Sequence, residues 1–372
     1  MKVLFLSNTA GQGHNATASA IMDMLTERGA ECKMLDTYAY INPVLYEALS
    51  RGYLFSTAVA PMAYGQWYRL AVKQKKDEKK HSLNKMVNSI MAFKLRKFMR
   101  DFNPDVIVCT HVLSALLVNI MKSHGYINAV SIGIITDFTV HPYWQDADNI
   151  DYFVSASELL TYQIVKRGIP ENKILPFGIP IHSKYKNKTE KTQARLNLGI
   201  DPDMFTVLLM SGSMGFGNIE QILLDMDAIG NEFQVLVVCG NNEHAKTNIE
   251  KLKTRKKVFT FGFVNNVEMM MDAADCIVSK PGGLTTSEAL AKNLPLIMIN
   301  PIPGQEDRNA EFMLNNGLAM SATKTVTIDE VLYQLFLYPE KLKNMQSNIS
   351  LVGKPNATKD LCDFILNIKR EV

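Results

Sequence analysis

The sequence predicts an α/β protein built of two doubly wound halves, and three observations lead to that prediction. Short apolar, β-branched runs alternate with amphipathic stretches along the whole chain, a pattern typical of parallel sheets covered by helices on both faces. The chain has 372 residues, about two to three times the size of one typical domain. Its opening pattern also recurs, because residues 207–218 align without a gap on residues 3–14 and share a Val, a Leu, a Ser and two glycines.

Nine apolar runs are the predicted strands, and the amphipathic stretches between them are the predicted helices. A Gly-Ile-Pro-Ile turn at residues 178–181 and the polar stretch 184–193 have the composition of a linker. We therefore expect a first domain over residues 1–180, a second over 190–338, and a helical tail over 339–372 that can pack back on the first. The predicted strands cover residues 3–6, 33–35, 106–109, 130–135, 153–154, 207–210, 235–238, 276–278 and 296–299.

Composition narrows the class of protein. Hydrophobic residues make up 47% of the chain and charged residues 21%, which excludes a disordered or collagen-like chain. No apolar run approaches the roughly 18 residues that span a bilayer. The five cysteines form no Cys-x-x-Cys pair, so neither a zinc site nor a disulfide framework is indicated. The sequence is typical of a cytoplasmic protein.

Positive charge gathers in one segment that follows an aromatic stretch. Between residues 69 and 100, eleven Lys and Arg residues stand against Asp77 and Glu78, a local charge of +9. Basic and aromatic residues together suit an anionic membrane surface, and we expect peripheral contact with the inner face of the cell membrane. A solvated helix face is the alternative; no nucleic-acid-binding motif accompanies the charge, so nucleic acid is not an expected partner. The residues expected to contact the acceptor or the membrane are Trp67, Tyr68, Lys75, Lys76, His141 and Trp144.

The first glycine-rich loop supports two interpretations. Gly11 and Gly13 stand between a predicted strand and a helix expected to begin near residues 15–18, where backbone N–H groups and the helix N-terminus can hold an anion. Gly11-x-Gly13-x-x-Ala16 also fits the dinucleotide-binding pattern, with Asp36 as the acid that would bind a ribose. An NAD(P)-dependent oxidoreductase therefore stays open as an alternative at this point.

His14 directly follows the second glycine of this loop. An imidazole titrates near neutral pH and can remove a proton from a hydroxyl group, so His14 is a candidate general base. A histidine that only hydrogen-bonds the loop is the alternative. Asp137, which follows the predicted strand 130–135, can orient His14 or act as the base itself. His111 and His141 stand at strand ends, where a structural histidine is the more common case.

The second half of the chain holds a denser group of polar residues. Residues 279–288, Ser-Lys-Pro-Gly-Gly-Leu-Thr-Thr-Ser-Glu, follow one predicted strand and lead into a helix. Their glycines and threonine hydroxyls can hold a pyrophosphate at the helix N-terminus, and the Glu288 carboxylate can accept both hydroxyls of a ribose. The polar run 301–309 follows the next strand and can bind sugar hydroxyls or cap a helix.

With these blocks in place, the sequence resembles the GT-B glycosyltransferases of the monogalactosyldiacylglycerol synthase and processive diacylglycerol glucosyltransferase type. That family is related to the peptidoglycan enzyme that glycosylates lipid I. The resemblance implies the GT-B fold, in which two Rossmann-like doubly wound domains face each other across a cleft. Five blocks match in the right order and span nearly the whole chain: residues 11–21, 136–144, 261–264, 279–288 and 304–309.

The resemblance implies a UDP-hexose donor, which is a substrate, and no cofactor. By position, residues 261–264 would contact uracil, Glu288 would take the ribose hydroxyls, and residues 282–286 would hold the diphosphate together with the loop 212–217. Glu306 and Asn309 would contact the transferred sugar, and His14 falls where the family has its candidate base. The residues implied in donor binding are Gly13, Gly212, Ser213, Gly215, Phe261, Gly262, Phe263, Val264, Gly282, Gly283, Leu284, Thr285, Thr286, Glu288, Gln305, Glu306 and Asn309.

The resemblance also implies the reaction, an inverting and metal-independent transfer of glucose or galactose to diacylglycerol or a glycosyl-diacylglycerol at the membrane surface. One general base removes the acceptor proton, and no covalent glycosyl intermediate forms. Glucose and galactose differ only at C4, and nothing in the sequence decides between them. The alternatives at this point are a GlcNAc transferase that acts on a polyprenyl-linked or other acceptor, the oxidoreductase, and a non-catalytic nucleotide-sugar sensor.

Overall fold

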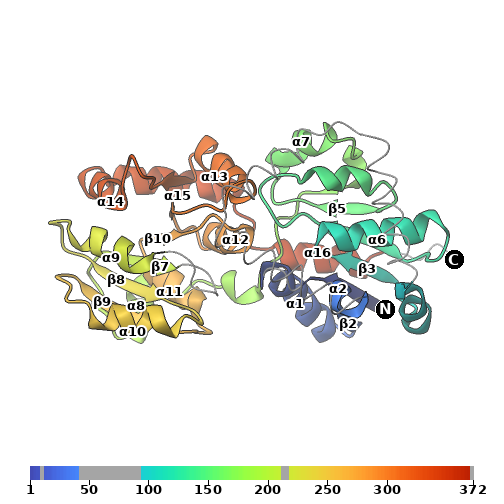
Figure 1. The fold of residues 1–372 in the computed structure, drawn as a ribbon, viewed down its shortest axis with the longest axis horizontal. Helices are drawn as coiled ribbons and strands as arrows, with labels where there is room; N and C mark the ends of the chain where they lie inside the picture. The colour runs from blue at the N-terminus through green and yellow to red at the C-terminus, as the bar shows by residue number, and fades with distance from the viewer. Residues whose placement is uncertain (9–11, 42–93, 211–217, 369–372) are drawn as a thin grey trace. The chain divides into compact units, whose positions relative to one another are not determined.

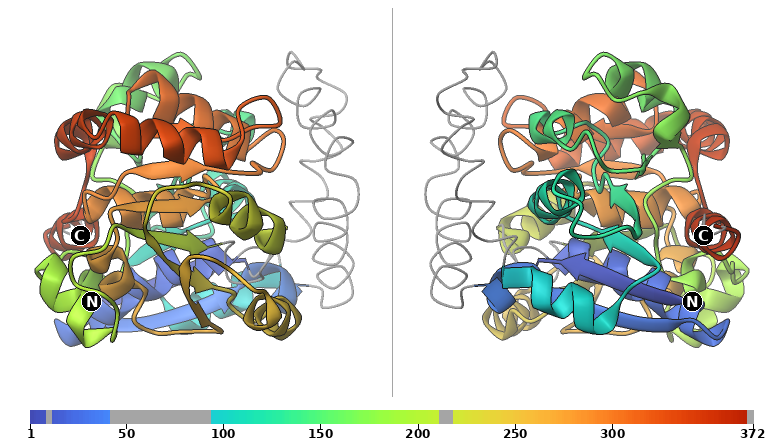
Figure 2. Two further views of the ribbon diagram at one scale, coloured as in Figure 1. Left: turned by 90° about the vertical axis from the view of Figure 1, so that its left-hand side faces the viewer. Right: turned by 90° about the vertical axis from the view of Figure 1, so that its right-hand side faces the viewer.

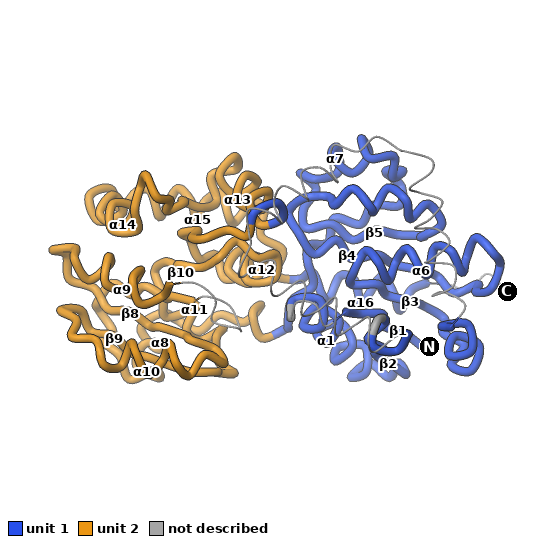
Figure 3. Tube along the Cα trace, viewed as in Figure 1, with its two compact units in different colours: residues 1–183, 303–305, 356–372 blue, residues 184–302, 306–355 orange. Residues whose placement is uncertain are grey.

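The computed structural model describes residues 1–8, 12–41, 94–210 and 218–368 (Figure 1). Contacts divide the chain into two compact units, drawn in blue and orange in Figure 3. Unit 1 comprises residues 1–183, 303–305 and 356–372, and unit 2 comprises residues 184–302 and 306–355. The described residues of each unit form one parallel sheet of six strands, so the predicted α/β fold with two doubly wound halves is confirmed.

The sheet of unit 1 consists of β1 (Lys2–Ser7), β2 (Glu31–Asp36), β3 (Val106–Cys109), β4 (Val130–Ile134), β5 (Tyr152–Val154) and β6 (Ile174–Leu175). Among the described residues, the strands lie in the order β2-β1-β3-β4-β5-β6. Leu6 lies beside Cys109, and Cys109 lies beside Gly133, so β1, β3 and β4 end at one edge. The order reverses between β1 and β3, and ligands of doubly wound folds bind at such a reversal, beyond the carboxyl ends of the strands.

The sheet of unit 2 consists of β7 (Thr206–Met210), β8 (Gln234–Val238), β9 (Lys257–Phe261), β10 (Cys276–Ser279), β11 (Leu296–Met298) and β12 (Ala319–Ser321). The strands lie in the order β12-β11-β10-β7-β8-β9. Counted from β7 as the first strand, this is the order of the dinucleotide-binding Rossmann domains. Leu209 lies beside Val278 where the order reverses, between β7 and β10.

Helices and short 3₁₀ helices, labelled η, surround the sheet of unit 1 (Figures 1 and 2). They are α1 (Gln12–Glu27), α2 (Thr37–Ile41), a helix over residues 94–102, α6 (Val112–Ser123), η1 (Pro142–Asp146), η2 (Glu158–Leu160), α7 (Thr161–Val165), η3 (Glu171–Lys173) and α16 (Ala357–Leu366). One face of the sheet, with Val3, Phe5 and Val108, forms a single core with Ile21 of α1 and Leu361 of α16. Helix α6 packs on β3 and β4, but its buried residues are not part of that core, so it covers the other face.

The helices of unit 2 are α8 (Lys191–Asn197), α9 (Ile219–Asp227), α10 (Glu243–Lys251), α11 (Val267–Ala273), α12 (Gly283–Ala291), α13 (Glu306–Asn315), α14 (Ile328–Leu337) and α15 (Glu340–Val352). Apolar side chains of α9 and α14, among them Leu223 and Leu332, pack on Val207, Leu209 and Val237 of the sheet. The amphipathic helical patterns of the sequence correspond to these buried faces.

The polar stretch predicted as a linker is fastened to unit 2. The ammonium group of Lys292 is fully buried, lies 2.7 Å from the Asp272 carboxylate and donates to the carbonyl of Asn187. Arg195 donates to the Asp275 carboxylate at 2.6 Å. These ion pairs explain why a stretch with the composition of a linker belongs to a folded unit, which begins at residue 184 rather than at 190.

The predicted C-terminal tail is divided between the two units. Helix α15 belongs to unit 2, and the change of unit comes at residue 356. Helix α16 belongs to unit 1, where Cys362 and Ile365 join the core that α1 covers. The Thr358 hydroxyl also donates to the carbonyl of Ile181 at 2.5 Å. The tail is therefore no single element, because the apolar faces of its two helices are buried in different cores.

Three strands have no counterpart among the predicted ones, and each lies at an edge of its sheet: β6, β9 and β12. β6 spans only two residues, and β9 and β12 are only partly buried. An edge strand has a partner on one side only, so it needs no continuous apolar run, and a continuous run is the signal that identified the central strands.

Gly133 of β4 provides a test of packing in the core of unit 1. A Cβ atom at this position would lie 2.7 Å from Cζ3 of the Trp144 ring and 3.3 Å from the Phe153 ring. We expect Gly133→Ala to lower the free energy of unfolding by about 1–3 kcal/mol, because overpacking of a filled core has that cost. Urea denaturation measures it. Gly230→Ala is the matched control, since a Cβ atom at Gly230 would have no neighbouring atom within 4 Å; equal effects of the two variants would contradict this packing.

Candidate active site

The carboxyl ends of β1 and β3 hold the first group of site residues. The Ser7 hydroxyl donates to the Asn15 side-chain oxygen at 2.5 Å, and the Thr110 hydroxyl donates to Ser7 at 3.1 Å. Ser7 and Thr110 are fully buried, so these bonds fix the first turn of α1 on the ends of both strands. Helix α1 begins at Gln12, earlier than predicted, and this places His14 and its neighbour Gly13 within the first turn.

The His14 ring is held in one orientation by the backbone. Its Nδ1 lies 2.7 Å from the carbonyl oxygen of Thr110 and 3.3 Å from the Thr136 hydroxyl. A carbonyl oxygen only accepts hydrogen bonds, so Nδ1 carries the proton and Nε2 keeps its lone pair. Burial lowers the pKa of His14 below its ordinary value, and the Asp137 charge and the Thr110 carbonyl oppose that shift. His14 is therefore neutral at pH 7 and can accept a proton at Nε2.

Two further histidines lie beside it. The His111 ring lies edge-on to the His14 ring, with 4.8 Å between centroids. His111 accepts the N–H of Leu113 at 3.3 Å, and His141 accepts the N–H of Tyr143 at 3.2 Å, so each caps the helix that follows it. Burial, His14 and His141 hold the pKa of His111 well below its ordinary range. The ring next to His14 is thus neutral and does not repel an incoming proton.

Asp137 follows β4 at the same edge of the sheet. Its carboxylate accepts a hydrogen bond from the Gln305 amide at 2.6 Å, and the segment 303–305 belongs to unit 1. The negative charge of Asp137 raises the pKa of His14 against the larger effect of burial. Asp137 is thus arranged to act on His14 through its charge and to hold the side chain of Gln305.

In unit 2, the N-terminus of α12 is arranged to bind an anion. The helix begins at Gly283, so Thr286 lies inside the helix and not in the loop that precedes it. The first N–H groups of a helix have no partner within it and carry roughly half a positive charge. The first turn of α12 has no acidic residue, whereas that of α13 has Glu306 and Asp307. The Thr286 hydroxyl is buried and finds no hydrogen-bond partner among the described residues.

Glu288 lies on the second turn of α12 and has an unusual acidity. Burial raises the pKa of Glu288 to about 7, and the Glu268 charge adds to that effect. The nearby Tyr185 hydroxyl and the charge of Lys184 lower the pKa of Glu288 and so act in the opposite direction. The carboxyl group is therefore close to half ionised at pH 7, because burial is the largest of the effects on its pKa.

Residues 261–264 lie at the end of β9. Phe261 is the last residue of the strand, and the Phe263 ring is 62% exposed. At Gly262 a Cβ atom would lie 3.4 Å from the Glu243 carboxylate of α10. The segment thus offers an exposed aromatic ring beyond the carboxyl end of a strand, where a planar base can stack.

Glu306 and Asn309 have structural contacts. Glu306 accepts the N–H of Ile302 at 2.6 Å and lies 3.7 Å from the position of a Cβ on Gly282. Asn309 is fully buried, and its amide donates to the carbonyl of Pro281 at 3.0 Å. The Asn309 bond braces the loop before α12, and the Glu306 bond braces the loop before α13, so both residues shape the site even where they touch no sugar.

The burial of Trp144 contradicts the expectation that this residue contacts the acceptor or the membrane. Its ring is 4% exposed, packs edge-on against Phe153 and fills the space above Gly133. It is a core residue with almost no surface to offer a membrane or a lipid. Seven predicted residues of the acceptor, membrane and phosphate sites lie outside the described residues: Trp67, Tyr68, Lys75, Lys76, Gly212, Ser213 and Gly215.

The chain contains three Asp-x-Asp triplets, at residues 146–148, 201–203 and 225–227. Within the described part of the chain, no group of three or more His, Cys, Asp or Glu side chains is arranged to hold a metal ion. No helix in that same part is long and apolar enough to cross a bilayer.

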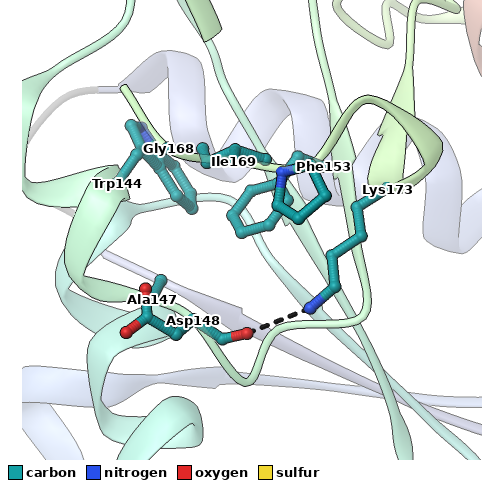
Figure 4. Close-up of a pocket in the computed structure, with 8 residues that line it drawn as sticks. Trp144, Ala147, Asp148, Phe153, Gly168, Ile169 and Lys173 are labelled. Carbon is teal, nitrogen blue, oxygen red and sulfur yellow. Dashed lines mark hydrogen bonds between the residues drawn. The ribbon is translucent and has the colours of Figure 1, made fainter. Parts of the chain in front are cut away.

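A small cavity of about 220 Å³ in unit 1 is lined by residues of η1, β5 and η3 and of the loops beside them (Figure 4). Its wall includes Trp144, Phe153 and Lys173. The Lys173 ammonium group donates to the carbonyls of Asp148 at 3.0 Å and Ile150 at 2.9 Å, so its charge fastens the loop that leads to β5. None of the candidate catalytic residues lines this cavity, and we assign it no ligand.

Comparison with known proteins agrees with this arrangement. Residues 14–181 match the family model of monogalactosyldiacylglycerol (MGDG) synthase, and residues 206–361 match the glycosyltransferase family 28 C-terminal domain. Processive diacylglycerol beta-glucosyltransferases of Bacillus pumilus and Bacillus mycoides are 26% and 27% identical to the chain. Each alignment covers 98% of this chain, with 94% and 93% of the respective relative.

Solved structures share the fold. MurG of Acinetobacter baumannii superposes with a TM-score of 0.63 at 16% identity, over 99% of both chains. The UDP-GlcNAc 2-epimerase of Neisseria meningitidis gives 0.61 at 15% identity, over 99% of this chain and 100% of that one. At these identities the likeness concerns the fold alone.

The protein is an enzyme, a UDP-sugar-dependent glycosyltransferase with the GT-B fold. It belongs to the family that joins a monogalactosyldiacylglycerol synthase domain to a glycosyltransferase family 28 C-terminal domain. The oxidoreductase alternative is wrong. Asp36, considered above as the acid for a dinucleotide ribose, instead accepts the N–H of Ala39 at 2.9 Å at the start of α2.

The roles of His14 and Asp137 can be separated by pH. If His14 is the base, His14→Ala lowers kcat by about 10²- to 10⁴-fold, the usual contribution of a general base. Asp137→Asn leaves activity but lowers the pKa of His14, because the charge that raises it is gone. The fall of kcat/KM at acid pH, which reports the protonation of His14, then occurs at a lower pH. Loss of all activity in Asp137→Asn, with His14→Ala still active, would make Asp137 the base.

Thr286 offers a test of the anion site in α12. Thr286→Val keeps the shape of the side chain and removes a buried hydroxyl that lacks a partner among the described residues. We expect an unchanged or slightly higher melting temperature, because an unpaired buried hydroxyl costs free energy. The affinity for UDP falls about tenfold if that hydroxyl meets the diphosphate. Thermal unfolding and calorimetric titration check the two expectations, and an unchanged affinity would remove Thr286 from the site.

Proposed function

We propose that the protein transfers glucose from UDP-glucose to diacylglycerol, or to a glycosyl-diacylglycerol, at a membrane surface. The observation that carries the proposal is the similarity to processive diacylglycerol beta-glucosyltransferases over 98% of the chain. The match of residues 14–181 to a family model of lipid galactosyl transfer supports a lipid acceptor for unit 1.

The proposed mechanism is a single displacement. The acceptor hydroxyl attacks the anomeric carbon, its proton passes to Nε2 of His14, and the bond between that carbon and the diphosphate oxygen breaks. The relatives are named beta-glucosyltransferases, and UDP-glucose is α-linked, so a beta product requires inversion. One base is then sufficient, as His14 with its free Nε2 provides.

We assign the leaving diphosphate to the N-terminus of α12. Backbone N–H groups and the helix dipole stabilise the charge that develops on the leaving group, and no metal is needed in this proposal. Glu288 would accept the ribose hydroxyls, with the ring of Phe263 against the uracil. Asn309 would keep the loop before α12 in the shape that this binding requires, and Glu306 would do the same for the loop before α13.

Membrane contact is proposed to be peripheral, through the basic and aromatic segment around residues 54–100. Eleven basic residues between 69 and 100 would each contribute about 1 kcal/mol near an anionic lipid surface. Most of that segment lies outside the described residues, and Lys94, Arg96 and Lys97 on the helix over residues 94–102 are exposed.

The test is UDP release from UDP-glucose, UDP-galactose and UDP-GlcNAc, each with and without diacylglycerol in anionic vesicles. We expect release from UDP-glucose that rises at least tenfold with the lipid, a β-linked product by NMR, and the same rate in EDTA. Release from UDP-GlcNAc alone would make the GlcNAc transferase the better assignment. A rate abolished by EDTA and restored by Mg²⁺ would refute the metal-independent mechanism.

A further inference from the structure

A ring of hydrogen bonds joins His14 to the ends of β1 and β3 within unit 1. The Thr110 hydroxyl donates to Oγ of Ser7 at 3.1 Å, and the Ser7 hydroxyl donates to the side-chain oxygen of Asn15 at 2.5 Å. Asn15 is the chain neighbour of His14, and Nδ1 of His14 lies 2.7 Å from the Thr110 carbonyl oxygen. The series of bonds therefore returns to the residue at which it began.

Thr110 lies between two elements, because β3 ends at Cys109 and α6 begins at Val112. Its backbone N–H donates to the carbonyl of Leu6 at 3.2 Å, and its hydroxyl donates to the next residue of β1, Ser7. These two bonds attach Thr110 to neighbouring positions of one strand. The orientation of its carbonyl is thereby set outside the regular hydrogen bonding of the sheet and of the helix.

The Thr110 carbonyl determines which nitrogen of His14 can accept a proton. A neutral imidazole carries its proton on one of two nitrogens, and the hydrogen bond made by one nitrogen decides which of them is protonated. A group that holds a catalytic imidazole in its reactive tautomer can contribute as much as about 10⁴-fold to kcat. A rotation of this carbonyl away from Nδ1 would free His14 to carry its proton on Nε2, and the proposed basic nitrogen would then have no lone pair.

Burial makes this ring of bonds hard to replace. The side chains of Ser7 and Thr110 are fully buried, so solvent does not take the place of a bond that is removed. The groups in the ring are neutral, so its loss changes the orientation of His14 and not the charge around it. The edge-on ring of His111, 4.8 Å from that of His14, and the charge of Asp137 stay in place.

We propose that Thr110 is a positioning residue for the transfer, whose hydroxyl, bound to Ser7, holds its own carbonyl in the orientation that keeps Nδ1 of His14 protonated and Nε2 free. The inference rests on the proposed function, in which Nε2 of His14 takes the acceptor proton. Thr110 touches no reacting atom. Its contribution is to kcat and not to donor binding, which is assigned to α12 of unit 2.

Two substitutions at Thr110 separate the hydroxyl from the packing of the side chain. Thr110→Val keeps the shape and removes the hydroxyl. We expect kcat for transfer from UDP-glucose to diacylglycerol to fall about tenfold, the effect of one hydrogen bond of ordinary strength, while KM for UDP-glucose and the affinity for UDP stay within twofold of the wild type. Thr110→Ser keeps the hydroxyl and removes a buried methyl group, so we expect a lower melting temperature and a kcat within twofold of the wild type.

The tautomer of His14 is observed directly by ¹⁵N NMR of the histidine side chains. The chain has seven histidines, and the signals of His14 are those absent from the spectrum of His14→Ala. At pH 8 His14 is neutral, because burial lowers its pKa, and we expect the wild type and Thr110→Ser to carry the proton on Nδ1. In Thr110→Val, we expect a measurable fraction of His14 with the proton on Nε2.

Thr37→Val is the matched control. Thr37 and Ser114 are both fully buried in unit 1, and their hydroxyls are hydrogen-bonded at 2.9 Å, but this bond is not part of the ring around His14. We expect Thr37→Val to lower the melting temperature and to leave both kcat and the tautomer of His14 unchanged.

Ser7→Ala removes the same bond from its other partner. We expect a fall in kcat at least as large as that of Thr110→Val. In the Ser7→Ala background, Thr110→Val then lowers kcat by less than twofold, because the bond that it would break is already absent.

The outcomes separate this inference from the proposed function. A Thr110→Val variant with the wild-type kcat and the Nδ1 tautomer, or a Thr110→Ser variant as slow as Thr110→Val, would overturn the role of the hydroxyl. Additive effects of Ser7→Ala and Thr110→Val would overturn it as well. A His14→Ala variant with the wild-type kcat would show that His14 is not the base, and a wild type that transfers no glucose would refute the proposed function; the inference fails with either.

Discussion

Each unit depends on one constraint: two neighbouring parallel strands at the centre of its sheet lead into helices on opposite faces of that sheet. In unit 1 the chain passes from β1 to α1 on one face and from β3 to α6 on the other. In unit 2, β7 leads to α9, which joins the main core, while β10 leads to α12, whose residues do not. Helices that leave to opposite faces cannot fill the space beyond the strand ends, so the loops there remain accessible to ligands.

The chemistry at these two edges follows from burial as much as from residue type. At the edge of unit 1, burial keeps His14 and His111 neutral, and a backbone carbonyl decides which nitrogen of His14 is free. At the edge of unit 2, a helix N-terminus without acidic residues attracts negative charge. A proton acceptor and an anion site are the two components that the proposed inverting transfer requires.

The sequence allowed much of this to be predicted. The central strands have continuous apolar runs, so both sheets were found. The glycine-rich loops identified the edge of each sheet at which the candidate site residues lie. The edge strands β6, β9 and β12 were missed because a strand with one partner needs no such run. The predicted join contains the boundary between the units, at residues 183 and 184, but the polar stretch after that boundary belongs to unit 2. Polar residues at 184–193 resemble a free segment, but Lys191 and Arg195 pair with Asp275, about 80 residues away in the sequence.

By itself, the sequence determined the fold class, the repeat of two strand–loop–helix units and the residue types at their loops, because these depend on local periodicity and spacing. Tertiary structure decided the burial of Trp144, the tautomer of His14, and the raised pKa of Glu288. Each of these depends on atoms distant in the chain, such as the Thr110 carbonyl beside His14. A pKa or a tautomer reports the surroundings of a group, and only the folded chain assembles those surroundings.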